Sequence, residues 1–255
     1  MPRTLIAGNW KMNGLKDSLT ELDHIVEGLS GAHTEADIAL CGPATLVALM
    51  AERALGSRLL IGGQTCHHAP SGAHTGDISA PMLKDAGASH VIVGHSERRE
   101  AHAERSTYVQ EQAYAALEAA LIPIICIGEN YNERQRGETD RVNERVLRKS
   151  MPYPGAQGDK VDFVVAYEPK WAIGTGQTPT MEQIESAHAH IRSILIEHQG
   201  EAGVDVQILY GGSMKPGNAA EILNIANVNG GLIGGASLKA EDFLAIYEAA
   251  ASEPD

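Results

Sequence analysis

Cysteine is scarce in this sequence. The 255 residues include three cysteines, Cys41, Cys66 and Cys126. A chain of this size can form a large hydrophobic core, and an odd number of cysteines is not typical of a disulfide framework. We therefore expect free thiols and a reducing compartment.

Basic residues and long apolar runs are also lacking. The sequence has 20 Lys and Arg against 33 Asp and Glu, a formal net charge of −13. This charge argues against nucleic acid or an anionic membrane as a partner. The first residues, 1–4, contain neither the apolar core of a signal peptide nor the start of a membrane span. We expect a cytoplasmic protein that binds neither nucleic acid nor membrane.

The sequence instead contains regularly alternating strand-like and helix-like segments. Apolar, β-prone runs predict strands at 5–9, 37–41, 59–64, 90–94, 122–127, 163–167, 206–210 and 231–235. Helical stripes separate these runs, and the segment 131–150 predicts one long, charged, exposed helix. Ser18…Glu21 and Thr180…Gln183 have the spacing of a capping box.

The strand–helix pairs repeat at intervals of roughly 30 residues, the size of one βα unit. Helices between strands require parallel pairing with right-handed crossovers, and eight such units can close into a barrel. No linker or low-complexity run divides the chain, so we expect a single α/β domain over residues 1–255. An open doubly wound sheet is the alternative, but Gly174-Thr-Gly176 lacks the third glycine of a dinucleotide-binding fingerprint.

The stretch Tyr167–Gly176 follows one of the predicted strands. Glu168 lies where that strand ends, and Pro169 cannot donate to a strand ladder. A carboxylate at the end of a buried strand requires water, a partner or a chemical role. The small residues after Trp171 predict a loop that can move and approach a ligand. A solvated Glu followed by a simple turn is the alternative.

Polar residues follow several other strands. In a (β/α)₈ barrel the loops after the strands share one face, where ligands bind. These loops carry Asn9, Lys11, His95, Glu168, Ser213, Gly234 and Gly235. Glycine-rich N–H clusters after the last two strands predict a phosphate site. A carboxylate and an imidazole beside a small phosphorylated molecule suit proton removal next to a carbonyl.

Several stretches together resemble the triosephosphate isomerase family over nearly the whole chain. The matching segments read AGNWKMN at 7–13, GHSERR at 94–99, AYEP at 166–169, WAIGTG at 171–176, YGGS at 210–213 and GGASL at 234–238. The resemblance implies a TIM barrel that acts as a homodimer without cofactor or metal. It also implies interconversion of dihydroxyacetone phosphate and glyceraldehyde 3-phosphate through an enediolate.

The resemblance also assigns roles to individual residues. It makes Glu168 the base, His95 the neutral electrophile and Lys11 the cation at the substrate, with Asn9 in support. Backbone N–H groups around Gly174, Ser213, Gly234 and Gly235 would hold the phosphate. Ile173 and Leu232 would close over Glu168, Glu97 would pair with Lys11, and residues 169–176 would form the lid.

The residues imply two pKa shifts in this mechanism. A helix that begins after His95 is expected to lower the pKa of the imidazole. Burial of Glu168 on lid closure is expected to raise its pKa.

The loop 65–79 is expected to be an interface element, because the resemblance implies docking of the region around Thr75 into a second subunit. His67, His68 and His74 in this loop are expected to splay apart, with no metal-binding ligand set. Compared with the family, Thr65, Asp77 and Lys170 are departures.

Three other functions remain open from the sequence. A related isomerase for a four-carbon tetrulose phosphate would keep the same site. A non-catalytic phosphate-binding barrel predicts loss of Glu168, His95 or Lys11, and all three are present. A Schiff-base aldolase would require a desolvated lysine, for which Lys11 is the candidate.

Overall fold

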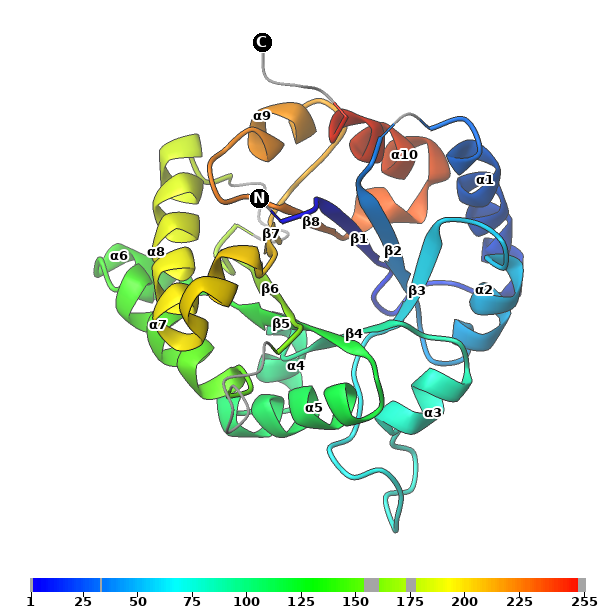
Figure 1. Cartoon of the computed structure of the whole chain (residues 1–255), viewed down its shortest axis with the longest axis horizontal. Helices are drawn as coiled ribbons and strands as arrows, with labels where there is room; N and C mark the ends of the chain where they lie inside the picture. Colours follow the sequence, from blue (N-terminus) through cyan, green and yellow to red (C-terminus); the bar gives the residue numbers. More distant parts are fainter. Residues whose placement is uncertain (1, 33, 154–160, 173–177, 252–255) are drawn as a thin grey trace.

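The computed structural model describes residues 2–32, 34–153, 161–172 and 178–251. Its centre is a closed barrel of parallel strands (Figure 1). The strands are β1 (Leu5–Asn9), β2 (Asp37–Cys41), β3 (Leu59–Gly63), β4 (His90–Val93), β5 (Ile122–Ile127), β6 (Val164–Tyr167), β7 (Ile208–Tyr210) and β8 (Gly230–Ile233). Pairing of β1 with β8, from Leu5 with Gly230 to Gly8 with Ile233, closes the ring. The predicted (β/α)₈ barrel is confirmed, and the open sheet is excluded.

Helices surround this barrel (Figure 1). They are α1 (Leu19–Leu29), α2 (Val47–Arg53), α3 (Ala80–Asp85), α4 (Ser96–Ala101), α5 (Ser106–Glu118), α6 (Tyr131–Gln135), α7 (Thr139–Ser150), α8 (Met181–Gln199), α9 (Ala219–Leu223) and α10 (Ala240–Ala249), with 3₁₀ turns η1 (Lys16–Ser18), η2 (Gly200–Asp205) and η3 (Gly235–Leu238). Among the helices in the described ranges, none combines the length and apolar character needed to cross a membrane.

The apolar core has two layers because successive strand residues point to opposite faces of the sheet. On β5, Ile124 and Cys126 belong to a cluster formed by the strands alone. Ile125 and Ile127 belong to the larger cluster between the barrel and the helices. Cys126 is fully buried, as expected for a small packed side chain.

The segment predicted as one helix at 131–150 is broken into α6 and α7, so that prediction is wrong. Gly137 lies between them with a positive φ of 68°, a conformation that ends a right-handed helix. The capping box predicted at Thr180 and Gln183 is confirmed by bonds of 3.1 and 3.3 Å between the two residues.

The capping box predicted at Ser18 and Glu21 is absent. The Ser18 hydroxyl accepts from the Leu15 N–H at 3.0 Å. The Glu21 carboxylate instead accepts from Lys239 Nζ and the Ala240 N–H, at 2.7 and 2.9 Å. Glu21 therefore connects α1 to the start of α10.

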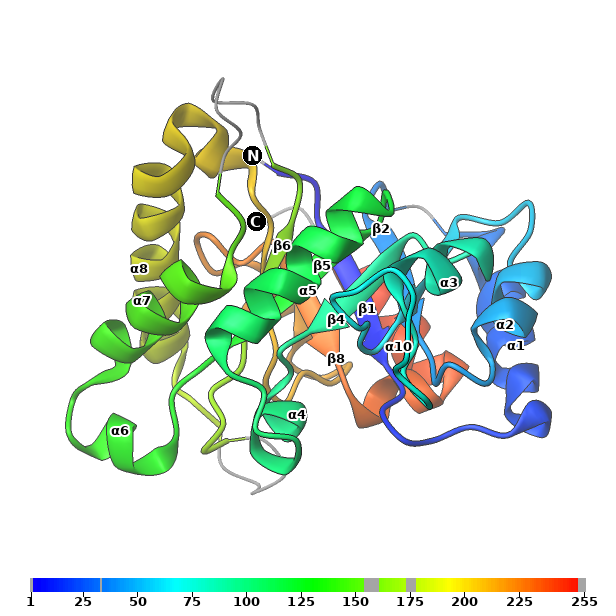
Figure 2. The same cartoon turned by 90° about the horizontal axis from the view of Figure 1, so that it is seen from below.

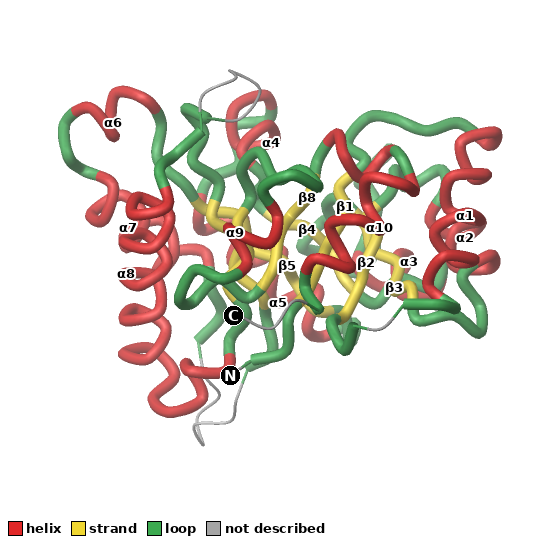
Figure 3. The backbone as a smooth tube through the Cα atoms, turned by 90° about the horizontal axis from the view of Figure 1, so that it is seen from above, coloured by secondary structure: helices red, strands yellow, loops and turns green. Residues whose placement is uncertain are grey.

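Parallel strands bring their carboxyl ends to one end of the barrel. Figures 2 and 3 show α4 and α6, which directly follow β4 and β5, at this same end. The loop between β3 and α3 extends beyond the ring of helices (Figure 1). The fold thus separates a face of strand ends from a projecting loop.

Candidate active site

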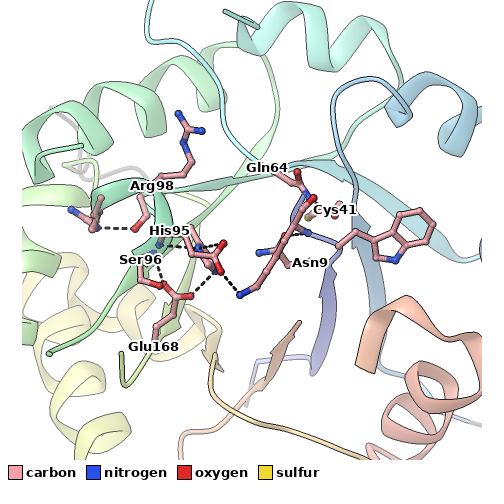
Figure 4. A network of polar contacts seen from close by, with 12 residues as sticks. Asn9, Cys41, Gln64, His95, Ser96, Arg98 and Glu168 are labelled. Carbon is pink, nitrogen blue, oxygen red and sulfur yellow. Dashed lines mark hydrogen bonds and ion pairs between the residues drawn. The ribbon is translucent and has the colours of Figure 1, made fainter. Parts of the chain in front are cut away.

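His95 and Glu168 face each other across the carboxyl ends of β4 and β6 (Figure 4). His95 Nε2 lies 2.8 Å from Glu168 Oε1. The second carboxylate oxygen accepts from the Ser96 N–H at 2.9 Å, in the first turn of α4. Glu168 is 2% exposed and His95 5% exposed, so the pair is shielded from water.

The local backbone indicates which nitrogen of His95 carries the proton. The Glu97 N–H donates to His95 Nδ1 at 3.3 Å, so the imidazole caps α4. A ring whose Nδ1 accepts carries its single proton on Nε2 in the neutral form. Nε2 is therefore the donor toward Glu168, and would be the donor toward a substrate oxygen in the same place.

Each partner changes the pKa of the other. Burial opposes protonation of His95, but the Glu168 and Glu97 carboxylates outweigh it and raise the pKa of the imidazole. Burial favours neutral Glu168, but His95, the Ser96 N–H and Lys11 outweigh it and lower the pKa of the carboxyl.

Both pKa directions depend on contact within the pair. The expectation that the helix start lowers the pKa of His95 is wrong for this arrangement, because the ring hydrogen-bonds directly to a carboxylate. If Glu168 moves away from His95 and Ser96, burial remains. Burial lowers the pKa of His95 and raises the pKa of Glu168. The carboxylate would then become the stronger base.

Lys11 reaches the same cavity from the loop after β1. Its Nζ lies 2.5 Å from Glu97 Oε1, which is the pairing that the resemblance implied. Its backbone is left-handed, with φ of 54°. The Lys11 N–H donates to Asn9 Oδ1 at 2.9 Å, which helps to fix this turn.

Gln64 completes the support of this turn, a role the sequence did not reveal. Its Nε2 lies 2.8 Å from Lys11 O, 3.2 Å from Cys41 O and 3.3 Å from Asn9 Oδ1 (Figure 4). Gln64 directly follows β3, so a polar residue at a strand end was the available signal.

The predicted site residues that are described line a cavity of about 690 Å³ at the strand ends. The candidate residues that line it are Asn9, Lys11, His95, Glu97, Glu168, Ser213, Leu232, Gly234 and Gly235. In the described part of the chain, the N–H groups of Ser213 and Gly235 donate to no other group, which leaves them available to an anion. Gly174 and Ile173, and with them residues 173–176 of the proposed lid, lie outside the described residues.

Glu129 is a second functional candidate that sequence reasoning missed. It lies two residues after the end of β5, in the loop at the same face as Glu168, and it is fully buried. Its carboxylate accepts from the Tyr167 hydroxyl at 3.1 Å and from Trp171 Nε1 at 2.9 Å. Glu129 therefore connects the residues on both sides of Glu168, including the start of the proposed lid. Lys170, the unexpected residue there, is half-buried.

The histidines of the projecting loop gather instead of splaying apart, so that expectation is wrong. Ring centroids lie 4.3 Å apart for His67 and His68 and 4.0 Å apart for His67 and His74. Ligand atoms of His67, His74 and Asp77 fall within 4.8 Å of one another. The His67 and His74 planes differ by 34°, so these rings overlap instead of directing in-plane lone pairs at one ion. His67 Nδ1 also accepts the Ala69 N–H at 3.0 Å.

Comparison with known proteins identifies the family. The family model described as triosephosphate isomerase matches residues 4–250. The triosephosphate isomerase of Hyphomonas neptunium is 55% identical over 251 residues, covering 98% of this chain and all of the relative. That of Jannaschia sp. is 57% identical over 249 residues, covering 98% of each chain.

The same family is found among solved structures. The crystal structure of triosephosphate isomerase from Bartonella henselae superposes with a TM-score of 0.89 at 44% identity. The match covers 97% of this chain and 98% of the other. The chain belongs to the triosephosphate isomerase family.

Proposed function

We propose that this chain interconverts dihydroxyacetone phosphate and D-glyceraldehyde 3-phosphate through an enediolate. The observation that carries the proposal is the buried contact between Glu168 and His95 beside the cavity that Lys11 also lines. Family membership supports the same activity. The proposed catalytic unit is a single barrel domain over residues 1–255.

In the proposed reaction, Glu168 removes a proton from the carbon next to the substrate carbonyl. His95 donates its Nε2 proton to the carbonyl oxygen, which gives the enediol its second hydroxyl, and a proton returns to the ring from the neighbouring oxygen. Glu168 then returns its proton to the adjacent carbon, so the isomerisation needs no external oxidant or reductant. Lys11, fixed by Asn9, stabilises the charge that develops on the oxygens.

The cavity also supports binding of the substrate's phosphate. Ser213 and Gly235, whose N–H groups are available, line this cavity together with Gly234. Gly174 is proposed as a further phosphate contact, and Ile173 with Leu232 as the apolar cover over Glu168. An aldolase mechanism is less well supported, because Lys11 is ion-paired with Glu97.

We further propose that the active form is a cytoplasmic homodimer. Met12 is 96% exposed and Leu15 77% exposed, which is unusual for large apolar side chains next to a catalytic loop. The projecting loop around Thr75 would dock on the second subunit near Lys11 and Glu97.

A coupled assay with three-carbon and four-carbon sugar phosphates tests the activity. We expect turnover of the triose phosphates and, for Glu168→Asp, a kcat lower by about 100-fold or more with little change in KM. Loss of one methylene withdraws the base from the substrate carbon without removing phosphate contacts. Glu185→Asp, an exposed carboxylate on α8, is the matched control.

The outcomes separate the alternatives. Faster turnover of the four-carbon substrate would assign the chain to the tetrulose phosphate reaction. No turnover with retained phosphate binding would indicate a binding barrel. A Glu168→Asp variant with near-normal kcat would remove Glu168 from the mechanism.

A further inference from the structure

Lys215 lies at the rim of the active-site cavity and has no role in the steps above. The charged residues that line this cavity are Lys11, Glu97, Glu168, Lys215 and Asp242. Negative groups thus outnumber positive ones around a cavity that is proposed to admit a phosphate dianion. The formal charge of the chain is −13, which adds to this repulsion.

The turn that carries Lys215 is connected to the phosphate-binding backbone. The Lys215 N–H donates to Asn218 Oδ1 at 2.7 Å, and Asn218 Nδ2 donates to Ser213 O at 3.1 Å. The Met214 N–H donates to Gly212 O at 2.9 Å. Lys215 therefore has a fixed backbone position two residues from Ser213.

The two lysines of the cavity differ in how their charges are used. Lys11 Nζ lies 2.5 Å from a Glu97 carboxylate oxygen, so its field at a distance is largely cancelled. Across the described ranges, Lys215 forms no ion pair, and its side chain is exposed. No carboxylate of the described residues is paired with Lys215, so its positive charge acts in full on an anion that approaches the cavity.

We propose that Lys215 guides the phosphate of the substrate into the cavity. The proposal rests on the proposed function, because it assumes that the site uses a phosphate dianion. Lys215 acts on approach and initial binding and takes no part in proton transfer. A unit charge and a dianion about 8 Å apart attract each other measurably even in water, and salt removes this attraction at such a distance.

The test compares Lys215→Gln with wild type on glyceraldehyde 3-phosphate across a salt series. At low ionic strength we expect kcat/KM to fall about three- to tenfold while kcat changes less than about twofold. The difference should disappear near about 0.5 M salt, where screening acts within a few ångströms. Turnover of glyceraldehyde, which lacks the phosphate, should be unchanged, and Lys215→Arg should behave like wild type.

Lys149→Gln is the matched control. It changes the net charge equally, but Lys149 is exposed on the last turn of α7 and is not among the residues that line the cavity. Equal salt profiles for Lys215→Gln and Lys149→Gln would overturn the proposal. A loss that persists at high salt and with glyceraldehyde would also overturn it, because it would indicate a structural role. A wild-type chain inactive on triose phosphates would instead overturn the proposed function, and the role of Lys215 with it.

Discussion

At the scale of single residues, the most constrained functional position is Lys11. A non-glycine residue with φ of 54° adopts a conformation that costs about 1–2 kcal/mol relative to right-handed backbone. The hydrogen bonds from Lys11 to Asn9, and from Gln64 to Lys11, offset this cost. The turn thus places an ammonium group at the cavity only because two polar side chains maintain it.

Substitution of Gln64 should therefore disturb the site without touching substrate. We expect Gln64→Leu to lower kcat/KM about tenfold or more and to reduce the free energy of unfolding by about 1–3 kcal/mol, because the Lys11 and Cys41 carbonyls lose a donor. Steady-state kinetics and urea unfolding measure both effects. Gln110→Leu removes a comparable bond, to Met151 O, away from the cavity. If the two variants show equal kinetics, Gln64 does not position Lys11.

At the scale of elements, β6 is held in place from both sides. The Tyr167 hydroxyl bonds to Glu129 at the end of β5, and its ring contacts the edge of His188 on α8, with centroids 5.8 Å apart. His188 is fully buried, and its Nε2 has no partner among the described residues. Burial therefore lowers the pKa of His188 to about 4, with a further contribution from Arg192.

This pKa shift makes the packing of α8 on β6 sensitive to acid. The folded protein holds His188 neutral, whereas the unfolded chain takes up the proton near the ordinary pKa of 6.5. Above pH 6.5 both states hold His188 neutral, so the free energy of unfolding does not depend on pH through this group. As the pH falls from 6.5 toward 4, the free energy of unfolding decreases by about 3 kcal/mol. His90, whose pKa is also lowered to about 4 by burial, changes in the same direction.

We expect His188→Gln to lose less stability than wild type between pH 7 and pH 4.5. The comparison uses urea unfolding at one protein concentration, because association would shift the transition. His190→Gln, at a half-buried position of the same helix, is the control and should keep the wild-type dependence. An unchanged pH dependence in His188→Gln would show that the ring is not held neutral by the fold.

At the scale of the whole molecule, the proposed homodimer rests on the projecting loop and on the exposed Met12 and Leu15. Deletion of residues 68–76 should give monomers of strongly reduced activity, because the loop would no longer support the region near Lys11. Sedimentation velocity measures the association state and circular dichroism the fold.

A point variant provides a second test in case the deletion variant does not fold. Thr75→Arg places a charge and a larger side chain in the proposed contact and should also weaken association. If both variants still sediment as dimers, another surface forms the interface.

The barrel could be predicted from the sequence because strand-like and helix-like periodicities alternate with short, regular connections. The single helix predicted at 131–150 was wrong because Gly137 adopts a backbone conformation that ends a helix. The capping box predicted at Ser18 and Glu21 was wrong because Glu21 bonds to Lys239, which is distant in the sequence. The predicted site residues that are described line one cavity, because strand ends in a parallel barrel must meet. Glu129 and Gln64 were missed because their importance lies in contacts across the barrel.

Closure of the barrel by its first and last strands has a consequence for biosynthesis. Leu5 pairs with Gly230, and Trp10 Nε1 donates to Ser237 O across 227 positions of sequence. At about 5–20 residues per second, a ribosome completes β8 on the order of tens of seconds after β1. Until then β1 has one strand neighbour and an open edge, which is a template for pairing with other chains. The nascent chain, more than the finished enzyme, is therefore the form most exposed to aggregation.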